Sequence, residues 1–207
     1  MRVSVVVVAA VAALGMTRGA EEGFESLFDG ESLAGWKASE NAASWKVANG
    51  ELVCHGPRSH LFYVGDDPAN APNFKNFHLK AEVLTKPKAN SGIYFHTRFQ
   101  ESGWPSHGHE AQVNNSSGDP VRTGSLYAVV KNFEAPAKDD EWFTEEVIVE
   151  GNHIVIKVNG KTIVDHVEKA DTIKDGRKLS SGTFALQAHD PGSEAHYRNI
   201  RVKRLPD

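Results

Sequence analysis

The sequence predicts an all-β fold, an antiparallel β-sandwich or jelly roll. Apolar and polar side chains alternate with period two through most of the chain after Phe24, which is typical of half-buried strands. Gly, Asn, Asp and Pro interrupt this alternation at short intervals, and no long stretch shows a helical period. Many short strands at this spacing favour two packed antiparallel sheets over a parallel α/β sheet.

Two Asn-Gly pairs predict the tightest turns. Asn49-Gly50 and Asn159-Gly160 each lie between short alternating runs, and such pairs tolerate the positive φ that a two-residue hairpin requires. The hairpin strands are expected at 45–47 with 51–53, and at 154–158 with 162–164. Further strands are expected at 77–84, 91–99, 109–114, 125–130, 144–150, 183–189 and 196–204. Loops are expected at 66–74, 99–107 and 135–140.

The first twenty residues differ in character from the rest. Arg2 precedes an apolar run at 3–16 made almost wholly of Val, Ala and Leu, which is typical of a secretory signal peptide and short for a membrane span. An uncleaved N-terminal anchor is the alternative. We expect a signal peptide at 1–20, one domain at 21–207, export to the periplasm or cell exterior, and no membrane span in the mature protein.

Charge and cysteine content narrow the choice of partners. The formal net charge is −4 with both signs mixed along the chain, so no extended basic surface is available for nucleic acid. Cys54 is the only cysteine, which excludes an internal disulfide, and its apolar neighbours favour a buried, inert thiol. The sequence does not indicate an oligomeric state.

Parity along four predicted strands places polar side chains on one face. Successive side chains of a strand point to opposite sides of the sheet, and in each of these four strands one parity is apolar. The opposite parity carries amides, rings and titratable groups: Tyr94, His96, Glu110, Gln112, Tyr127, Gln187 and His189. Amides hydrogen-bond sugar hydroxyls and rings pack on sugar C–H faces, so a carbohydrate is the expected ligand. An ordinary solvated face is the alternative.

Motifs along nearly the whole mature chain resemble the bacterial 3-keto-disaccharide hydrolase domain family. They include Asn90-Ser91-Gly92-Ile93-Tyr94-Phe95, Gly108-His109-Glu110-Ala111-Gln112-Val113, Thr123-Gly124-Ser125-Leu126-Tyr127 and Ala185-Leu186-Gln187-Ala188-His189-Asp190. The resemblance implies a concanavalin-like pair of curved sheets, and cleavage of glycosides already oxidised to the 3-keto form. Many family members carry Arg where this sequence has His96, with Arg98 two residues later.

A ketone at C3 acidifies the C2 proton, so such an enzyme needs a base, a proton donor and an oxyanion contact. We expect Glu110 and His189 to be the proton-transfer pair, because both are titratable and share the polar face; which is acid and which is base stays open. The substrate contacts are expected at Tyr94, His96, Gln112, Tyr127 and Gln187. A divalent metal ion is a possible cofactor that the resemblance allows, but the sequence shows no clear ligand set.

Several of these residues have alternative structural roles. His189 could simply bond the loop that begins at Asp190, and Glu110 could be a structural acceptor. His107 and His109 have the spacing of a metal pair but no evident third ligand. Trp104 could be a sugar platform, although packing is the commoner role.

Two other functions use the same fold. A noncatalytic carbohydrate-binding module needs only shape, rings and amides. A glucanase needs two acidic residues on one strand face, and Gln112 stands where the second would follow Glu110.

Overall fold

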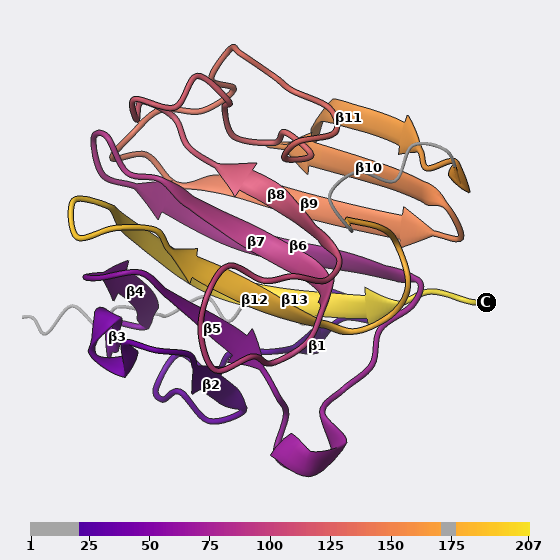
Figure 1. Ribbon diagram of the computed structural model, residues 1–207, viewed down its shortest axis with the longest axis horizontal. Helices are drawn as coiled ribbons and strands as arrows, with labels where there is room; N and C mark the ends of the chain where they lie inside the picture. The colour runs from indigo at the N-terminus through magenta and orange to yellow at the C-terminus, as the bar shows by residue number, and fades with distance from the viewer. Residues whose placement is uncertain (1–20, 171–176) are drawn as a thin grey trace, which may run out of the picture.

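The computed structural model describes residues 21–170 and 177–207, and these form two antiparallel sheets packed face to face (Figure 1). The 8-stranded sheet comprises β1 (Glu25–Ser26), β3 (Trp45–Ala48), β4 (Glu51–His55), β6 (Phe77–Thr85), β9 (Phe143–Glu150), β10 (His153–Val158), β11 (Lys161–Val167) and β13 (Glu194–Arg204). The 5-stranded sheet comprises β2 (Trp36–Ala38), β5 (Ser59–Tyr63), β7 (Ser91–Thr97), β8 (His109–Val113) and β12 (Thr183–Ala188). Two short 3-10 turns are η1 (Ala42–Ser44) and η2 (Pro68–Asn70). The predicted all-β sandwich is therefore confirmed.

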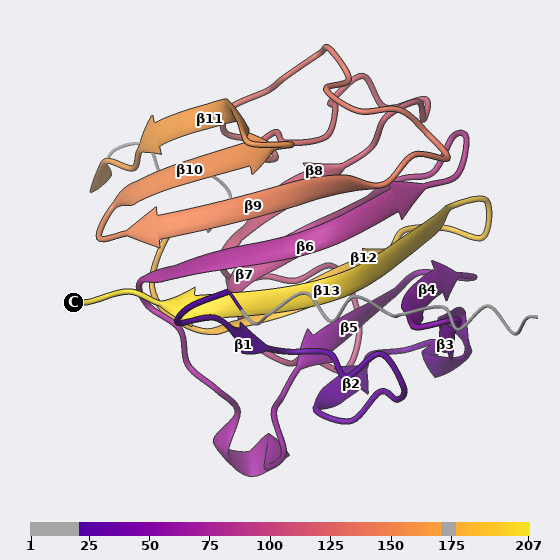
Figure 2. The same ribbon diagram turned by 180° about the vertical axis from the view of Figure 1, so that it is seen from behind.

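All strand pairs in both sheets are antiparallel. The larger sheet runs β11-β10-β9-β6-β13-β4-β3 with β1 beside β13, and the smaller runs β2-β5-β12-β7-β8. The 5-stranded sheet is in front in Figure 1. The 8-stranded sheet is in front in Figure 2, which views the molecule from the opposite side. Both Asn-Gly hairpins are confirmed, joining β3 to β4 and β10 to β11. Asn49 and Asn159 have φ of 55° and 49°, as a two-residue turn of this kind requires.

The hydrophobic core lies between the sheets. On β6 every second residue is buried, and these side chains meet the inward side chains of the smaller sheet, including Ile93 and Phe95 of β7. Cys54 also lies in this core, and burial raises the pKa of its thiol to about 12. It is thus a packing residue rather than a nucleophile, as expected.

One predicted strand is wrong. Residues 125–130 form no strand; Leu126 makes isolated bridges to Ala111 and Val130, and the chain reverses at Ala128 with φ of 64°. The start of the segment nevertheless runs beside β8, because the Tyr127 N–H donates to the Glu110 carbonyl. The prediction also missed β2, which is only three residues long, and β5, whose residues lack the alternation of a one-sided strand.

The predicted signal peptide falls at 1–20, outside the described residues. Among the residues that are described, no helix is long and apolar enough to cross a membrane.

Candidate functional site

A pocket of about 230 Å³ opens on the face of the 5-stranded sheet that points away from the core. Its lining combines amides, rings and charged groups: Asn90, Tyr94, Trp104, Glu110, Gln112, Asp119, Tyr127, Arg177, Gln187 and His189. The pocket therefore brings together six of the seven predicted site residues, all except His96.

A larger hollow of about 500 Å³ lies on the outer face of the 8-stranded sheet. Its cations Lys80 and Arg201 both pair with Glu21, at 2.6 and 3.1 Å. Ion pairs of this kind are typical of a solvated surface. The smaller pocket is the candidate site, since it holds buried polar side chains that converge.

Gly92 explains how the polar groups of the pocket meet. It lies opposite Gln112 on β8, and Tyr94 two residues on lies opposite Glu110. Because Gly92 has no side chain, the Glu110 carboxyl group leans over it; a Cβ there would be 2.3 Å from Glu110 Oε1. The carboxyl group thereby reaches β12, where Gln187 Nε2 donates to it at 2.9 Å.

The surroundings of Glu110 raise its pKa to about 7. Burial is the main cause, since the residue is only 3% exposed and the ionised form loses hydration. Hydrogen bonding from Tyr94, the charge of Arg177 and the Gln187 amide oppose this rise, while Asp119 adds to it. A carboxyl group that titrates near neutrality can take up or release a proton at physiological pH.

The amides of the pocket are held in fixed orientations. Gln187 Nε2 donates to the Tyr94 hydroxyl at 3.0 Å as well as to Glu110. Gln112 Nε2 donates to Asn90 Oδ1 at 2.8 Å. Because these donors are occupied, the orientation of both amides follows from the network rather than from a ligand.

His189 lies at the rim of the pocket, with its side chain 36% exposed. Its Nδ1 is 2.8 Å from Asp190 Oδ2, and because a carboxylate only accepts, Nδ1–H is the donor. This leaves Nε2 as the nitrogen that can exchange a proton with a bound molecule. The bond to the loop at Asp190, named above as the alternative role of His189, therefore exists. It orients the imidazole as the aspartate of a catalytic triad does.

Trp104 closes the pocket on the side of His189. Its ring is 42% exposed and lies 5.1 Å from the His189 ring and 5.5 Å from that of His60. The loop that carries it is tied to Glu40, which accepts the Gly103 N–H and pairs with Arg58. Trp104 thus packs on two histidines at the rim of the pocket and leaves part of its surface exposed.

His60 was not anticipated from the sequence. It faces the same side of the sheet as Gln187, its partner in the β5–β12 register, and is fully buried under Trp104. Neither ring nitrogen has a hydrogen-bond partner within the described residues. Burial lowers its pKa to about 4, so the ring is neutral at pH 7.

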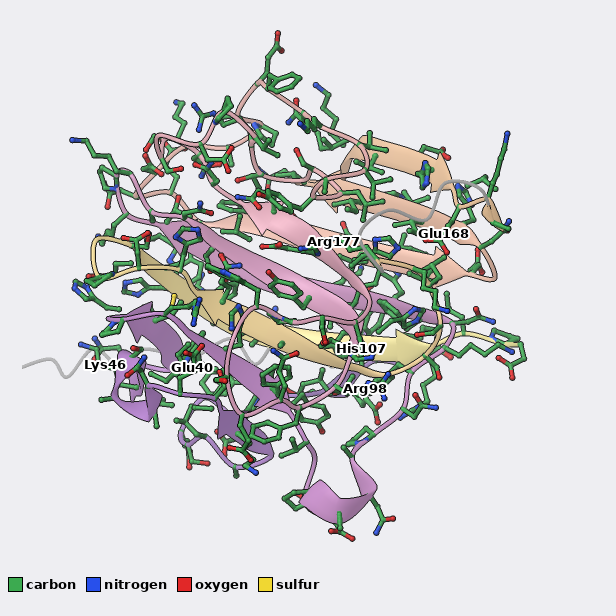
Figure 3. All side chains as sticks on the ribbon, viewed as in Figure 1. Glu40, Lys46, Arg98, His107, Glu168 and Arg177 are labelled. Atoms are coloured by element: carbon green, nitrogen blue, oxygen red, sulfur yellow. The ribbon has the colours of Figure 1, made fainter. Side chains whose placement is uncertain are left out.

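Arg177 and Asp119 also enter the pocket from loops. The Arg177 guanidinium lies 5.4 Å from the centre of the Tyr127 ring, a cation–π contact. Neither residue was predicted to line the sugar site, because loops carry no periodicity from which a facing direction follows. Arg98, the cation noted in the sequence, is exposed and is not among the described residues that line the pocket; Figure 3 shows it near His107, away from Arg177.

The expected position of His96 is wrong. It has φ of 54°, and the β7–β12 register shifts beside it, so its side chain leaves the alternation of the strand. The imidazole is 2% exposed and packs on Phe77, donates from Nε2 to the Lys75 carbonyl, and accepts the Ser180 N–H at Nδ1. Both nitrogens are therefore used within the protein, and burial lowers the pKa of the ring to about 4.

The described residues form no evident metal site. Nowhere in 21–170 and 177–207 do three His, Cys, Asp or Glu side chains converge. His109 is buried against Glu168, whereas His107 bonds Ser106 at the surface, so the two do not act together. We assign no metal ligand and derive no step through a metal.

Comparison with known proteins agrees with this description. The family model of the 3-keto-alpha-glucoside-1,2-lyase-like domain matches residues 23–203. No curated protein matches the sequence.

Solved structures share the fold at low sequence identity. A candidate glycosyl hydrolase from Parabacteroides distasonis ATCC 8503 aligns with a TM-score of 0.73 at 22% identity, over 89% of this chain and 95% of its own. The carbohydrate-binding module CBM66 from Bacillus subtilis aligns at 0.58 and 12% identity, over 82% and 96%. SCLam, a non-specific endo-beta-1,3(4)-glucanase of family GH16, aligns at 0.57 and 13%, over 90% and 93%. At these identities the likeness concerns the fold.

Proposed function

Because this chain belongs to the family of 3-keto-alpha-glucoside-1,2-lyase-like domains, we propose that it cleaves glycosides that carry a ketone at C3. The family itself comprises glycoside hydrolase- and lyase-like domains. One observation carries the proposal: Glu110, with a pKa of about 7, shares a small pocket with the oriented His189–Asp190 pair. A base of this strength suits removal of a proton that the C3 ketone has acidified.

In the proposed reaction Glu110 takes the C2 proton. The electron pair of the C2–H bond first forms an enolate, with a C2=C3 double bond and an oxyanion at C3. As the ketone re-forms, that pair becomes the C1=C2 double bond, and the C1–O bond to the aglycone breaks. His189 gives the departing oxygen a proton from Nε2, which its rim position favours, since the aglycone leaves toward solvent. The products are an unsaturated 3-keto sugar and the free aglycone; later addition of water completes a net hydrolysis.

Arg177 supplies the cationic contact for the oxyanion at C3. Its guanidinium lies over Tyr127 at the pocket, and its positive charge already lowers the pKa of Glu110. A fixed positive charge stabilises the enolate more than the neutral ketone, so it accelerates proton removal. Gln112, Gln187 and Tyr94 hold the sugar hydroxyls and the base in place.

The size of the pocket supports a single sugar ring at the reacting position. Its volume of about 230 Å³ is smaller than the roughly 300–1,000 Å³ of pockets for drug-sized ligands. A disaccharide would therefore place its second ring outside, beside the exposed Trp104. The N-terminal apolar run further supports export, which we propose for the mature domain.

Noncatalytic sugar binding is the second candidate, favoured by the amide network and the exposed tryptophan. The enzyme and the binding module are distinguished by giving the purified protein methyl 3-keto-glucoside or methyl glucoside and measuring methanol release. We expect release from the oxidised substrate alone, and loss of release in Glu110→Gln and His189→Ala. Binding of either sugar without release, with and without added divalent metal, would favour the binding module.

A further inference from the structure

His109 and Glu168 form a buried pair next to the pocket but outside it. His109 Nε2 lies 2.7 Å from Glu168 Oε2, and the two side chains are 1% and 12% exposed. Since a carboxylate only accepts, His109 donates from Nε2. Its Nδ1 has no partner in the described chain, and burial lowers the pKa of the imidazole, which favours the neutral ring.

Glu168 also holds the backbone that follows Arg177. Its two carboxyl oxygens accept the Leu179 N–H at 2.9 and 3.2 Å. The next amide, of Ser180, donates to His96 Nδ1 at 3.2 Å. Two consecutive amides are thus fixed by buried side chains just two and three residues after the guanidinium that enters the pocket.

Glu168 is itself well anchored. Its N–H donates to the Asn152 carbonyl at 2.8 Å, and its own carbonyl accepts from Asn152 Nδ2 at 3.1 Å. Among the described residues, Arg177 stacks on the half-buried ring of Tyr127, a contact that is less directional than a hydrogen bond. In Figure 3 Arg177 lies inward of Glu168, toward the middle of the 5-stranded sheet.

We propose that Glu168, supported by His109 and with His96 beside it, is a positioning residue that holds the Arg177 guanidinium in the pocket. The catalytic role of Arg177 in this proposal rests on the proposed function, whereas the way Glu168 positions Arg177 does not. It also gives a purpose to two buried histidines that make no contact with the pocket. Buried carboxylate–histidine pairs are costly to form, and here the pair fixes a loop rather than filling a core.

The test is a double-mutant cycle between Glu168→Ala and Arg177→Met, read out on the Glu110 carboxyl by ¹³C NMR titration. Arg177 lowers the pKa of Glu110, so R177M raises it. E168A should raise it in the same direction, and should add nothing once R177M is present. This readout needs no substrate, so it remains valid even if the protein proves unable to cleave 3-keto-glycosides.

Activity gives the second readout. E168A should lower kcat/KM for methyl 3-keto-glucoside by at least roughly 10-fold, mainly through kcat, because Arg177 stabilises the enolate more than the ketone. E168Q should retain part of the wild-type kcat/KM through its remaining acceptor. The matched control is E146A, which removes an equally buried partner of His78 (2.8 Å) on the other sheet. It should leave the Glu110 pKa unchanged.

Additive effects of E168A and R177M on the Glu110 pKa would overturn the proposal, as would an E168A titration identical to wild type. Should E168A not fold, the same cycle with E168Q decides: a smaller upward shift that vanishes in R177M supports the proposal, and no shift refutes it.

Discussion

The carboxyl group of Glu110 lies across Gly92 and meets the Gln187 amide at 2.9 Å, although β8 and β12 are not neighbours in the sheet. The strand between them, β7, carries no side chain at this point. A gap one side chain wide therefore lets a carboxyl group, an amide and the Tyr94 hydroxyl form one buried network. This contact fixes the position of the proposed base, and its burial there raises its pKa.

Gly92→Ala should abolish this arrangement. The added Cβ would lie 2.3 Å from Glu110 Oε1 and 3.0 Å from its Cγ and Cδ, so the carboxyl group must move. A displacement of about 1 Å can cost roughly 100-fold in rate, and we expect a loss of that order in kcat/KM. Steady-state kinetics measures it.

Gly118→Ala is the matched control, because a Cβ there meets nothing within 4 Å and neither glycine has a positive φ. It should have wild-type activity. Near-wild-type activity of G92A would show that the Glu110 position is not needed.

Activity should depend on pH through Glu110. The base must be ionised, and its pKa of about 7 means that kcat/KM falls as the pH drops below about 7. Tyr94→Phe removes a hydrogen bond that lowers this pKa, so the acid limb should move to higher pH. The profiles of both proteins on methyl 3-keto-glucoside measure the shift; a limb that stays in place, or moves down, contradicts the assignment.

Regular strands explain which site residues were predictable. Tyr94, Glu110, Gln112 and Gln187 lie on uninterrupted stretches of β7, β8 and β12, where parity determines the facing side. Tyr127 reaches the pocket although its segment is no strand, because its N–H is bonded to the backbone of β8.

Irregular backbone explains the rest. The positive φ of His96 itself turns its side chain away from the pocket. A histidine does not mark a bulge in the sequence, so this turn could not be predicted. Trp104, Asp119 and Arg177 come from loops whose path depends on distant anchors such as Glu40 and Glu168. Their direction follows from tertiary contacts, which a single sequence does not display.

Trp104→Ala should weaken sugar binding more than it slows the chemistry. The ring packs against His189 and lies at the rim, so its loss should raise KM roughly 5-fold, since aromatic packing contributes on the order of 1 kcal/mol. It also uncovers His60, whose pKa of about 4 results mainly from burial and should rise. Kinetics and histidine NMR titrations measure the two effects.

Trp142→Ala is the control for this change, because that ring stacks on Arg198 at 3.9 Å and does not line the pocket. It should alter neither KM nor the His60 titration. If W104A leaves both unchanged, Trp104 has no role at the site.

Glu145→Met should stabilise the protein. Glu145 points from β9 into the core, and neither carboxyl oxygen has a hydrogen-bond partner in the described chain. Burial raises its pKa well above 4.5, so the folded state favours the protonated form. Removing an unpaired buried polar group should increase the free energy of unfolding by about 1 kcal/mol or more at pH 7.

The sign of the pH dependence provides a sharper check. In the wild type, the raised pKa of Glu145 contributes stability to the folded state. This contribution is fully present below the pKa of about 4.5 that Glu145 has in the unfolded chain, and it is lost as the pH rises toward the folded-state pKa. The gain from E145M should therefore be smallest near pH 4 and increase toward pH 8. Urea unfolding at several pH values measures it, with the exposed Glu150→Met on the same strand as the control. A gain that does not change with pH would mean that the ionisation of Glu145 has no part in stability.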